Sequence, residues 1–317
     1  MKTKLIDYVD NGPIFITGHV NPDGDALGSA FALKLFLDSQ NIISDVDFDI
    51  TTKLPSNLNH LPYHLISDDL KEKYNTVFVF DCGNSSRLGK YEEVVLAAEN
   101  VVVIDHHVDP SFGDVQIIDP HAASTTQVLF RQFKDENIEI NEEMANCLLT
   151  GLITDTGRFQ YSNTTSEVFS IAAELLGNGA NLSKISENIY GSIEFNALTL
   201  QSKIIERIVL NEDLQFAHSI VFQNDYKDYQ VEPEETDFLI DVVRLVKEST
   251  VALLIKEQED GSFKGSLRSR GDIDVQKIAS IFGGGGHVAA SGFSSNQSPE
   301  FIPVSYTHLT LPTITGV

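Results

Sequence analysis

The sequence contains few cysteines, few basic residues and no long apolar run. Its two cysteines, Cys82 and Cys147, are isolated, so they predict neither a disulfide framework nor a thiolate zinc site. No stretch of 18 apolar residues occurs, and the first residues lack the apolar core and small-residue cleavage site of a secretion signal. Together these absences predict a protein of the reducing cytoplasm with no membrane-spanning helix.

Basic residues are outnumbered two to one by acidic ones. The chain has 22 Lys and Arg against 46 Asp and Glu, a formal net charge of −24. Such a surface repels a long phosphate backbone, because binding one requires Lys and Arg to displace its counterions. We therefore expect no long nucleic-acid duplex as a partner. An anionic substrate must therefore be small or must bind where the chain is locally less acidic. Residues 256–280 are such a segment, because their five basic and five acidic residues give no net charge.

Apolar runs alternate with helical patterns in the first half of the chain. The runs at residues 14–17, 76–80 and 100–104 are nearly continuous, as in strands that are buried on both faces of a parallel sheet. The second half has another rhythm, with a hairpin signal around Gly261. The fold class that we predict is α/β: a larger N-terminal domain with a mostly parallel sheet flanked by helices, then a smaller α+β domain.

Carboxylates and imidazoles gather where the predicted strands and helices end, and open α/β sheets bind their ligands at the carboxyl ends of strands. These residues are His19, Asp23, Asp25, Asp81, Asp105, His106, His107 and Asp155. Like charges a few ångströms apart favour protonation over ionisation, and divalent cations would remove that conflict. An oxygen and imidazole set without thiolate suits manganese, and then magnesium, iron or cobalt. One carboxylate shared by two ions would give a two-metal site for phosphoryl chemistry.

Each of these clusters has a simpler explanation when it is taken alone. His19 could be a turn residue, Asp23 and Asp25 are good caps for the helix that begins there, and Asp155 could close a turn. The metal interpretation depends on their joint occurrence. No structural need explains a carboxylate and a double histidine at the end of one buried strand.

The second half contains a glycine run at residues 283–286, followed by His287. The run could be a flexible loop, but consecutive backbone N–H groups that no side chain covers can form a concave site for an anion. Arg268 and Arg270 alternate to one face of the preceding predicted strand, and guanidinium groups suit phosphate or carboxylate. We therefore expect an anion pocket in this half.

These motifs resemble those of the DHH-family phosphoesterases that carry a C-terminal DHHA1 domain, most closely the nanoRNase and pAp-phosphatase group (NrnA-like). The matching segments are residues 18–29 (GHVNPDGDALGS), Asp81, residues 105–107 (DHH), 154–157 (TDTG), 266–270 (SLRSR) and 282–287 (FGGGGH). The resemblance implies a manganese-dependent enzyme that hydrolyses short RNA or DNA oligonucleotides to mononucleotides. It also implies conversion of 3′-phosphoadenosine 5′-phosphate (pAp) to AMP.

The resemblance further implies a role for each matching residue. It predicts two Mn²⁺ ions, with Mg²⁺ or Co²⁺ as replacements, held by two sets that share Asp81: His19, Asp23 and Asp81, and Asp25, Asp81, His106 and Asp155. Asp105 would orient His106, and His107 would contact the scissile phosphate or assist the leaving group. The rest of the substrate would be held by Arg268, Arg270, Gly284, Gly285, Gly286 and His287.

The resemblance also predicts the domain boundaries. We expect a DHH catalytic domain at residues 1–192, a connecting helix at 193–213 and a DHHA1 substrate-binding domain at 214–303. Family members usually continue with a further strand and an amphipathic helix, whereas the tail at 304–317 has no helical apolar stripe. We expect that tail to be non-native or disordered. A homodimer is a further expectation from the family.

Three other functions fit parts of the pattern. A pApA or cyclic di-AMP phosphodiesterase of the same superfamily would use the same motifs. A family II inorganic pyrophosphatase shares the motifs of the first domain but is not expected to have the glycine-rich segment before His287. A nucleotide-binding sensor that has lost catalysis is the alternative outside the enzymes, and the carboxylates at every motif position argue against it.

Overall fold

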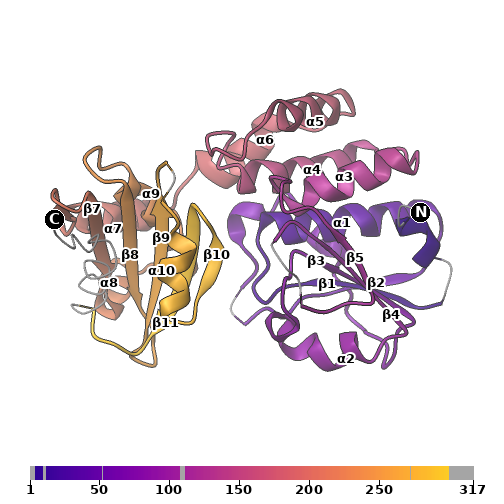
Figure 1. Cartoon of the computed structure of the whole chain (residues 1–317), viewed down its shortest axis with the longest axis horizontal. Helices are drawn as coiled ribbons and strands as arrows, with labels where there is room; N and C mark the ends of the chain where they lie inside the picture. The colour runs from indigo at the N-terminus through magenta and orange to yellow at the C-terminus, as the bar shows by residue number, and fades with distance from the viewer. Residues whose placement is uncertain (1–3, 10–11, 52, 108–110, 272, 300–317) are drawn as a thin grey trace, which may run out of the picture. The chain divides into compact units, whose positions relative to one another are not determined.

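The chain divides into two compact units, residues 1–192 and 193–317, each with its own sheet (Figure 1). The structure is a computed structural model, and it describes residues 4–9, 12–51, 53–107, 111–271 and 273–299. The predicted non-native tail at 304–317 lies outside these residues. Among the residues described, no helix combines the length and the apolarity that crossing a bilayer requires.

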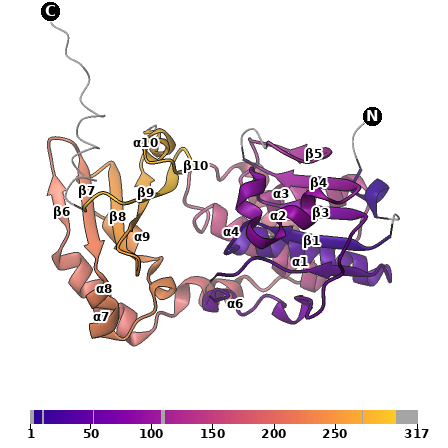
Figure 2. The same ribbon diagram turned by 90° about the horizontal axis from the view of Figure 1, so that it is seen from below.

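The first unit contains a five-stranded sheet in the order β2-β1-β3-β4-β5, and every neighbouring pair is parallel (Figure 2). The strands are β1 (Ile14–Gly18), β2 (Ser44–Val46), β3 (Thr76–Phe80), β4 (Asn100–Asp105) and β5 (Val115–Ile118). The chain passes from β1 to one edge and from β3 to the other. The sheet therefore has a topological switch point between β1 and β3, where doubly wound sheets bind ligands.

Both faces of this sheet are covered by helices (Figure 1). One face packs against α1 (Gly24–Ser39) and α3 (Thr125–Asp135), α4 (Glu142–Asp155) packs on these two helices, and α5 (Ser166–Gly177) packs outside them on α4. The other face packs against η4 (Ser85–Tyr91) and α2 (Glu92–Leu96). Alternate strand residues enter each core, for example Ile16 and Phe78 on one side and Phe15 and Val77 on the other. This burial on both faces explains the continuous apolar runs.

Helices α1 and α4 approach closely because glycines line their contact. A Cβ on Gly28 would lie 2.4 Å from the carbonyl oxygen of Cys147, and one on Gly24 would lie 2.6 Å from Thr154 Cγ2. Only residues without a side chain permit this distance. The close packing brings the first turn of α1 next to the last turn of α4. The shorter helical segments of this unit are η1 (Leu5–Tyr8), η2 (Ser56–Leu58), η3 (Tyr63–Leu65), α6 (Leu182–Ser186) and η5 (Glu187–Gly191).

The second unit contains a six-stranded sheet in the order β10-β11-β9-β8-β7-β6, antiparallel except for the pair β7 and β8. Its strands are β6 (Val209–Asn211), β7 (Phe216–Val221), β8 (Val251–Glu257), β9 (Phe263–Ser269), β10 (Gly285–His287) and β11 (Ala290–Ser295). The predicted fold class, a larger domain with a parallel sheet followed by a smaller α+β domain, is confirmed.

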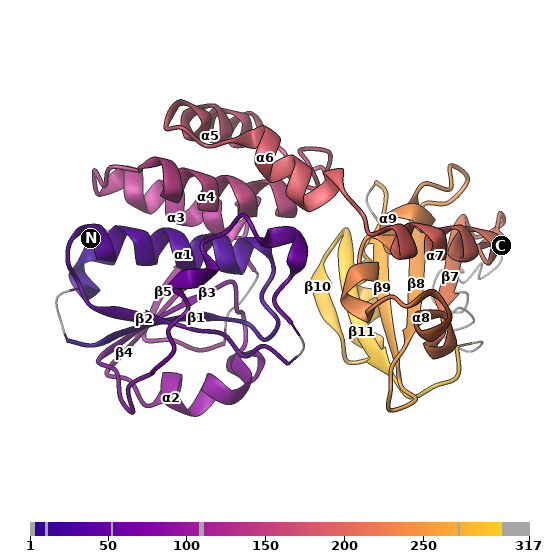
Figure 3. The ribbon, with the colours of Figure 1, turned by 180° about the vertical axis from the view of Figure 1, so that it is seen from behind.

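Two separate cores flank the second sheet. One face packs against α7 (Phe195–Glu206), α8 (Gln223–Tyr229) and α9 (Leu239–Arg244), which stand in front of it in Figure 3, and the other against α10 (Val275–Ile281). The segment η6 (Pro233–Thr236) precedes α9. The helix that we expected at 193–213 is α7, and it buries Ala197, Leu200 and Ile204 in the core of this unit. It is therefore an integral part of the second unit.

Candidate metal centre

The first unit brings the predicted ligand-type residues to the carboxyl edge of its sheet. His19 follows β1 and Asp81 follows β3, so they flank the switch point, and Asp105 is the last residue of β4. Asp23 caps α1 by accepting from the N–H groups of Asp25 and Ala26 at 3.0 and 3.2 Å. The capping role considered for Asp23 is thus confirmed, and it coexists with a position beside the other carboxylates.

Three groups of ligand-type atoms form at this edge, and within each group the atoms lie within 4.8 Å of one another. The groups are His19, Asp23 and Asp81; Asp25, His106 and Asp155; and Asp81, Asp105, His106 and His107. The first group is the first predicted ligand set. The second group contains every member of the second predicted set except Asp81. Asp81 lies between them, because its Oδ2 is 3.6 Å from His19 Nε2 and its Oδ1 is 3.6 Å from His106 Nε2.

The backbone of Asp81 adopts a conformation that few non-glycine residues have. Its φ is 55°, in the left-handed region. Strained backbone of this kind costs about 1–3 kcal/mol and is concentrated at functional sites. The conformation lets the chain leave β3 while the Asp81 carboxylate stays buried, with the residue 3% exposed.

The rings of His19 and His106 each direct Nε2 toward carboxylates. His106 Nε2 lies 3.3 Å from Asp155 Oδ2 and 3.9 Å from Asp25 Oδ2. Its Nδ1 is 3.2 Å from the carbonyl oxygen of Ala122, and His19 Nδ1 is 2.9 Å from that of Val20. A carbonyl only accepts, so Nδ1 carries the proton in both rings and Nε2 is the nitrogen that can bind a cation.

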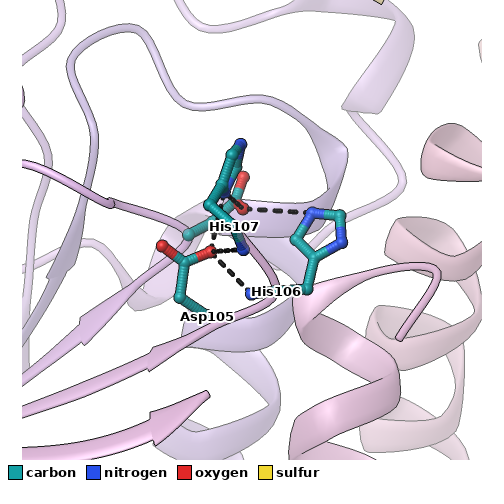
Figure 4. Close-up of side chains that lie close together, drawn as sticks. Asp105, His106 and His107 are labelled. Carbon is teal, nitrogen blue, oxygen red and sulfur yellow. Dashed lines mark hydrogen bonds and ion pairs between the residues drawn. The ribbon is translucent and has the colours of Figure 1, made fainter. Parts of the chain in front are cut away.

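Asp105 contacts the two histidines in a way that corrects our expectation (Figure 4). Its Oδ1 accepts from the backbone N–H groups of His106 and His107 at 2.7 and 3.0 Å, and it lies 2.7 Å from His107 Nδ1. The expected contact with the His106 ring is wrong, because that ring turns to the Ala122 carbonyl and Asp155. Asp105 therefore orients the ring of His107 and only the backbone of His106.

The electrostatics of the site show a conflict between buried charges. Burial, with the charges of Asp155 and Asp81, raises the pKa of Asp25 well above its usual range. Burial also raises the pKa of Asp155 to about 6. Burial by itself lowers the pKa of a histidine, but the adjacent carboxylates outweigh it and raise the pKa of His19 to about 10 and that of His106 to about 11. A protein with no other cation at this site would hold protons there.

Divalent cations fit this donor set. The two groups that contain the predicted ligand sets, His19, Asp23 and Asp81 and Asp25, His106 and Asp155, offer only carboxylate oxygens and imidazole nitrogens. Hard or borderline divalent ions prefer such donors to thiolates. A cation in each group would offset the repulsion that raises the pKa of Asp25 and would replace the protons on the imidazoles.

Two site residues escaped the sequence analysis, and both lie in the first turn of α3. The N–H groups of Thr125 and Thr126 donate to the two oxygens of Asp25, and the Thr125 hydroxyl donates to Asp81 Oδ1. The run Ser124-Thr125-Thr126 signals a helix start, since Ser124 caps α3 by accepting from the Gln127 N–H at 3.0 Å. No local pattern shows that the next two residues bond to carboxylates of distant segments.

The two predicted arginines of the second unit have different surroundings. Arg268 is half-buried in β9, its Nη1 donates to the Leu267 carbonyl at 3.0 Å, and its buried Nε has no hydrogen-bond partner among the described residues. Arg270 lies beyond the end of β9, and its guanidinium donates to the carbonyls of Arg244, the last residue of α9, and of Val246 beyond it. The structure therefore does not bring the two guanidinium groups to one ligand; Arg270 stabilises the end of α9.

The glycine run also differs from the expected anion loop. The N–H groups of Gly283 and Gly284 donate to the carbonyls of Ser280 and Ala279 at 3.0 and 2.9 Å, which closes the end of α10. Gly285, Gly286 and His287 form β10 and pair with β11. The expectation of a concave row of available N–H groups is wrong for Gly283 and Gly284, because α10 uses their donors.

Comparison with known proteins identifies both halves of the chain. Residues 13–152 match the model of the DHH family N-terminal domain, and residues 213–303 match that of the DHHA1 domain. The chain is 33% identical over 290 residues to the bifunctional oligoribonuclease and PAP phosphatase NrnA of Thermus thermophilus, covering 89% of this chain and 83% of that one. It is 28% identical over 305 residues to a probable enzyme of the same name from Streptococcus mutans, covering 94% of each.

A solved structure has the same architecture. The crystal structure of an exopolyphosphatase-related protein from Bacteroides fragilis aligns with a TM-score of 0.87 at 26% identity, covering 96% of this chain and 93% of that one. The family models match the domain types and the order that the motifs predict, and the first of them spans every candidate metal ligand except Asp155. The chain therefore belongs to the DHH family of metal-dependent phosphoesterases and resembles its NrnA-like members.

Proposed function

We propose that this phosphoesterase hydrolyses short oligonucleotides to mononucleotides and pAp to AMP. The observation that carries the proposal is Asp81, whose two oxygens face two separate groups of ligand-type side chains. A carboxylate shared by two cations is the arrangement that hydrolyses phosphate esters. The relatives from Thermus thermophilus and Streptococcus mutans, whose names give both activities, support the choice of substrates.

We assign the two cations to Mn²⁺, with Mg²⁺ or Co²⁺ as replacements, because the donors are oxygen and imidazole nitrogen only. The two proposed ligand sets are His19, Asp23 and Asp81, and Asp25, Asp81, His106 and Asp155. When bound, the cations would supply a water of lowered pKa and would neutralise charge on the phosphate. The Nδ1 contacts of His19 and His106 with carbonyls keep their Nε2 atoms directed at these positions.

We assign the proton transfer to His107. Its side chain is 20% exposed, so a substrate can reach it, and its Nδ1 lies 2.7 Å from Asp105 Oδ1. A carboxylate at Nδ1 fixes the ring and stabilises its protonated form, which leaves Nε2 to give a proton to the leaving oxygen. Burial lowers the pKa of His107, but Asp105 and Asp81 outweigh it and raise that pKa to about 10, which favours the protonated ring.

We assign substrate binding to the second unit, with Arg268 as its principal phosphate contact. Its half-buried position and its buried Nε support this role. Gly284, Gly285, Gly286 and His287 remain proposed contacts. The roles of residues 1–192 as the catalytic domain and 214–303 as the substrate domain are part of the same proposal; residues 193–213, expected as a connection, begin the second unit with α7. Cytoplasmic location and a homodimer are predictions as well; the two buried free cysteines support the former.

A substrate panel tests the proposal. Purified protein is stripped of metal and then given Mn²⁺, Mg²⁺, Co²⁺ or none, with pAp, a dinucleotide, a pentanucleotide, pApA, cyclic di-AMP or pyrophosphate. Release of AMP from pAp and of mononucleotides from the dinucleotide, with Mn²⁺ the best ion, is the expected result. Exclusive turnover of pApA or cyclic di-AMP would contradict the proposed substrates. Nucleotide binding without turnover under any ion would indicate a sensor.

A further inference from the structure

A single residue of α3, Thr125, bonds to two carboxylates of the metal centre. Its backbone N–H donates to Asp25 Oδ2 at 2.6 Å, and its hydroxyl donates to Asp81 Oδ1 at 3.1 Å. The next N–H, that of Thr126, donates to Asp25 Oδ1 at 2.9 Å. Asp25 and Asp81 lie 100 and 44 residues from Thr125 in the sequence, so these bonds are tertiary contacts and not local capping.

We propose that Thr125 is a positioning residue that fixes the rotation of the Asp81 carboxylate. The terminal torsion of an aspartate is broad, so the side chain by itself does not decide which oxygen faces which neighbour. In the structure Oδ1 faces His106 Nε2 and His107 Nδ1, at 3.6 and 3.3 Å, and Oδ2 faces His19. The Thr125 hydroxyl bonds to Oδ1, which holds that oxygen on the His106 side and leaves Oδ2 for the His19 side.

The chemistry of a hydroxyl suits this place. Thr125 is fully buried, so the hydroxyl donates to the carboxylate where water cannot easily replace it. It carries no charge, and so it neither competes with a cation for the carboxylate nor repels one, as a lysine or arginine would. Thr125 thus orders the shared carboxylate without neutralising it.

The inference rests on the two-cation arrangement proposed above. It identifies Thr125 as the residue that holds the shared Asp81 carboxylate in its orientation. Hydrogen-bond partners of metal ligands change metal affinity by about 10–100-fold when they are removed. Loss of the Thr125 hydroxyl should therefore lower the binding affinity for at least one of the two cations by that factor. This loss of metal affinity should be measurable in the absence of substrate.

The test is a titration of metal-stripped protein with Mn²⁺ in the absence of substrate, with free Mn²⁺ followed by electron paramagnetic resonance. Wild type should bind two ions. Thr125→Ser and Thr125→Ala both lack the γ-methyl group, but only serine keeps the hydroxyl. We expect Thr125→Ser to bind both ions within about threefold of wild type, and Thr125→Ala to lose about 10–100-fold in affinity for at least one.

A matched control comes from the opposite end of the strand that precedes Asp81. Thr76 begins β3, is fully buried, and its hydroxyl has no hydrogen-bond partner among the residues that the structure describes. Thr76→Ser should therefore bind both ions as wild type does, and Thr125→Val, which keeps the shape of threonine, should behave like Thr125→Ala. Circular dichroism of each metal-free variant reports whether it is folded.

The outcomes separate this inference from the proposal beneath it. Two ions in wild type and in Thr125→Ala, with equal affinities, would overturn the role of Thr125 alone. Equal losses in Thr125→Ser and Thr125→Ala would also overturn it, because they would assign the effect to the methyl group. Fewer than two ions in wild type would overturn the two-cation proposal and this inference together.

Discussion

The two units place their charged candidate residues in opposite environments. In the first unit Asp25, Asp81 and His106 are 0%, 3% and 6% exposed, and backbone or side-chain groups hold each of them. In the second unit Arg268 is half-buried, and Arg270 is engaged by backbone carbonyls. Groups that hold cations must be fixed against their mutual repulsion, whereas a group that attracts a phosphate can lie on an accessible strand.

Sheet topology accounts for this difference. All strands of the first sheet are parallel, so residues that follow β1, β3 and β4 meet at one edge. In the second sheet β9 runs antiparallel to both of its neighbours, β8 and β11. Its candidate residues come from two strands and the loop after β9: Arg268 of β9 and His287 of β10 both lie opposite Ala290 of β11, and Arg270 follows the end of β9. We expect changes in the first unit to act mainly on kcat and changes in the second to act on KM or on stability.

The largest effect is expected from Asp81, the residue on which the first unit depends. Asp81→Asn keeps the shape of the side chain, and asparagine tolerates the left-handed backbone, but it removes the shared charge. We expect kcat to fall on the order of 10³-fold or more, since cations supply several kcal/mol of transition-state stabilisation. Assay of pAp hydrolysis, with circular dichroism as the control for folding, checks this. A folded variant with near wild-type turnover would refute the shared-ligand role.

The neighbouring histidines provide the next test. Both rings lie near Asp81 Oδ1, but the His106 ring also faces Asp155 and Asp25, whereas the His107 ring faces Asp105. His107→Gln should lower kcat by about 10²-fold or more, as the loss of a general acid does, while Mn²⁺ affinity stays within a few-fold of wild type. His106→Gln should weaken Mn²⁺ binding itself, because its Nε2 faces Asp155 and Asp81. Metal titration and kinetics on both variants check the pair. Equal metal affinities in the two would remove the distinction.

The two arginines test the second unit in the same way. Arg268→Ala should raise KM for pAp about tenfold, the equivalent of one phosphate contact of about 1.4 kcal/mol, with unchanged thermal stability. Arg270→Ala should instead destabilise the protein by about 2 kcal/mol, because it leaves carbonyls after α9 without their charged donor. Denaturant unfolding and steady-state kinetics distinguish them. If Arg270→Ala raises KM as much as Arg268→Ala does, both residues contact the substrate, as the sequence predicts.

The smallest effect concerns exposed charge in the first unit. Arg131 of α3 pairs with Glu167 of α5 at 2.6 Å and lowers the pKa of that carboxyl below its usual range. The Glu167 side chain is 48% exposed, so solvent screens the pair, and Glu167→Gln should cost about 0.2–1 kcal/mol at pH 7. Because the pKa of Glu167 is lower in the folded state, the pair stabilises the protein at pH values above the unfolded-state pKa of about 4.3. This stabilisation is lost as the pH falls through the folded-state pKa.

The pH dependence supplies the check on Glu167. The stability difference between wild type and Glu167→Gln should therefore shrink as the pH is lowered from about 5 to 3, around the unfolded pKa. Denaturant unfolding at several pH values measures it. A difference that is constant over this range would show that the pair contributes through packing and not through charge.

Local sequence patterns determined much of the fold. The predicted strands at 14–17, 76–80 and 100–104 correspond to β1, β3 and β4, because burial on both faces leaves continuous apolar runs. The short strands β2 and β5 have no such run, so the sequence does not predict them. They become strands by pairing with β1 and β4, because their own residue pattern is too weak to specify a strand. The apolar spacing of residues 233–247 favours a single helix, but the structure divides this segment into η6 and α9.

The sequence also placed the candidate ligands together. Residues that follow buried parallel strands share one edge whatever the details of packing, so His19, Asp81 and His106 could be grouped before the structure was known. Asp155 could be added because it ends a helix whose last turn lies at the same edge. The residue types then limited the chemistry to hard or borderline divalent cations.

Only the tertiary structure decided which partner each group meets. The bonds from Thr125 to Asp25 and Asp81, from Asp105 to the His107 ring, and from Arg270 to the carbonyls after α9 depend on side-chain rotamers or on segments far apart in the chain. A one-dimensional pattern records residue types and spacing, and hydrogen bonds require positions within about 3 Å. The sequence therefore determined the set of charges in the metal centre, and the packing of α3 on the sheet and of α4 on α1 determined their orientation.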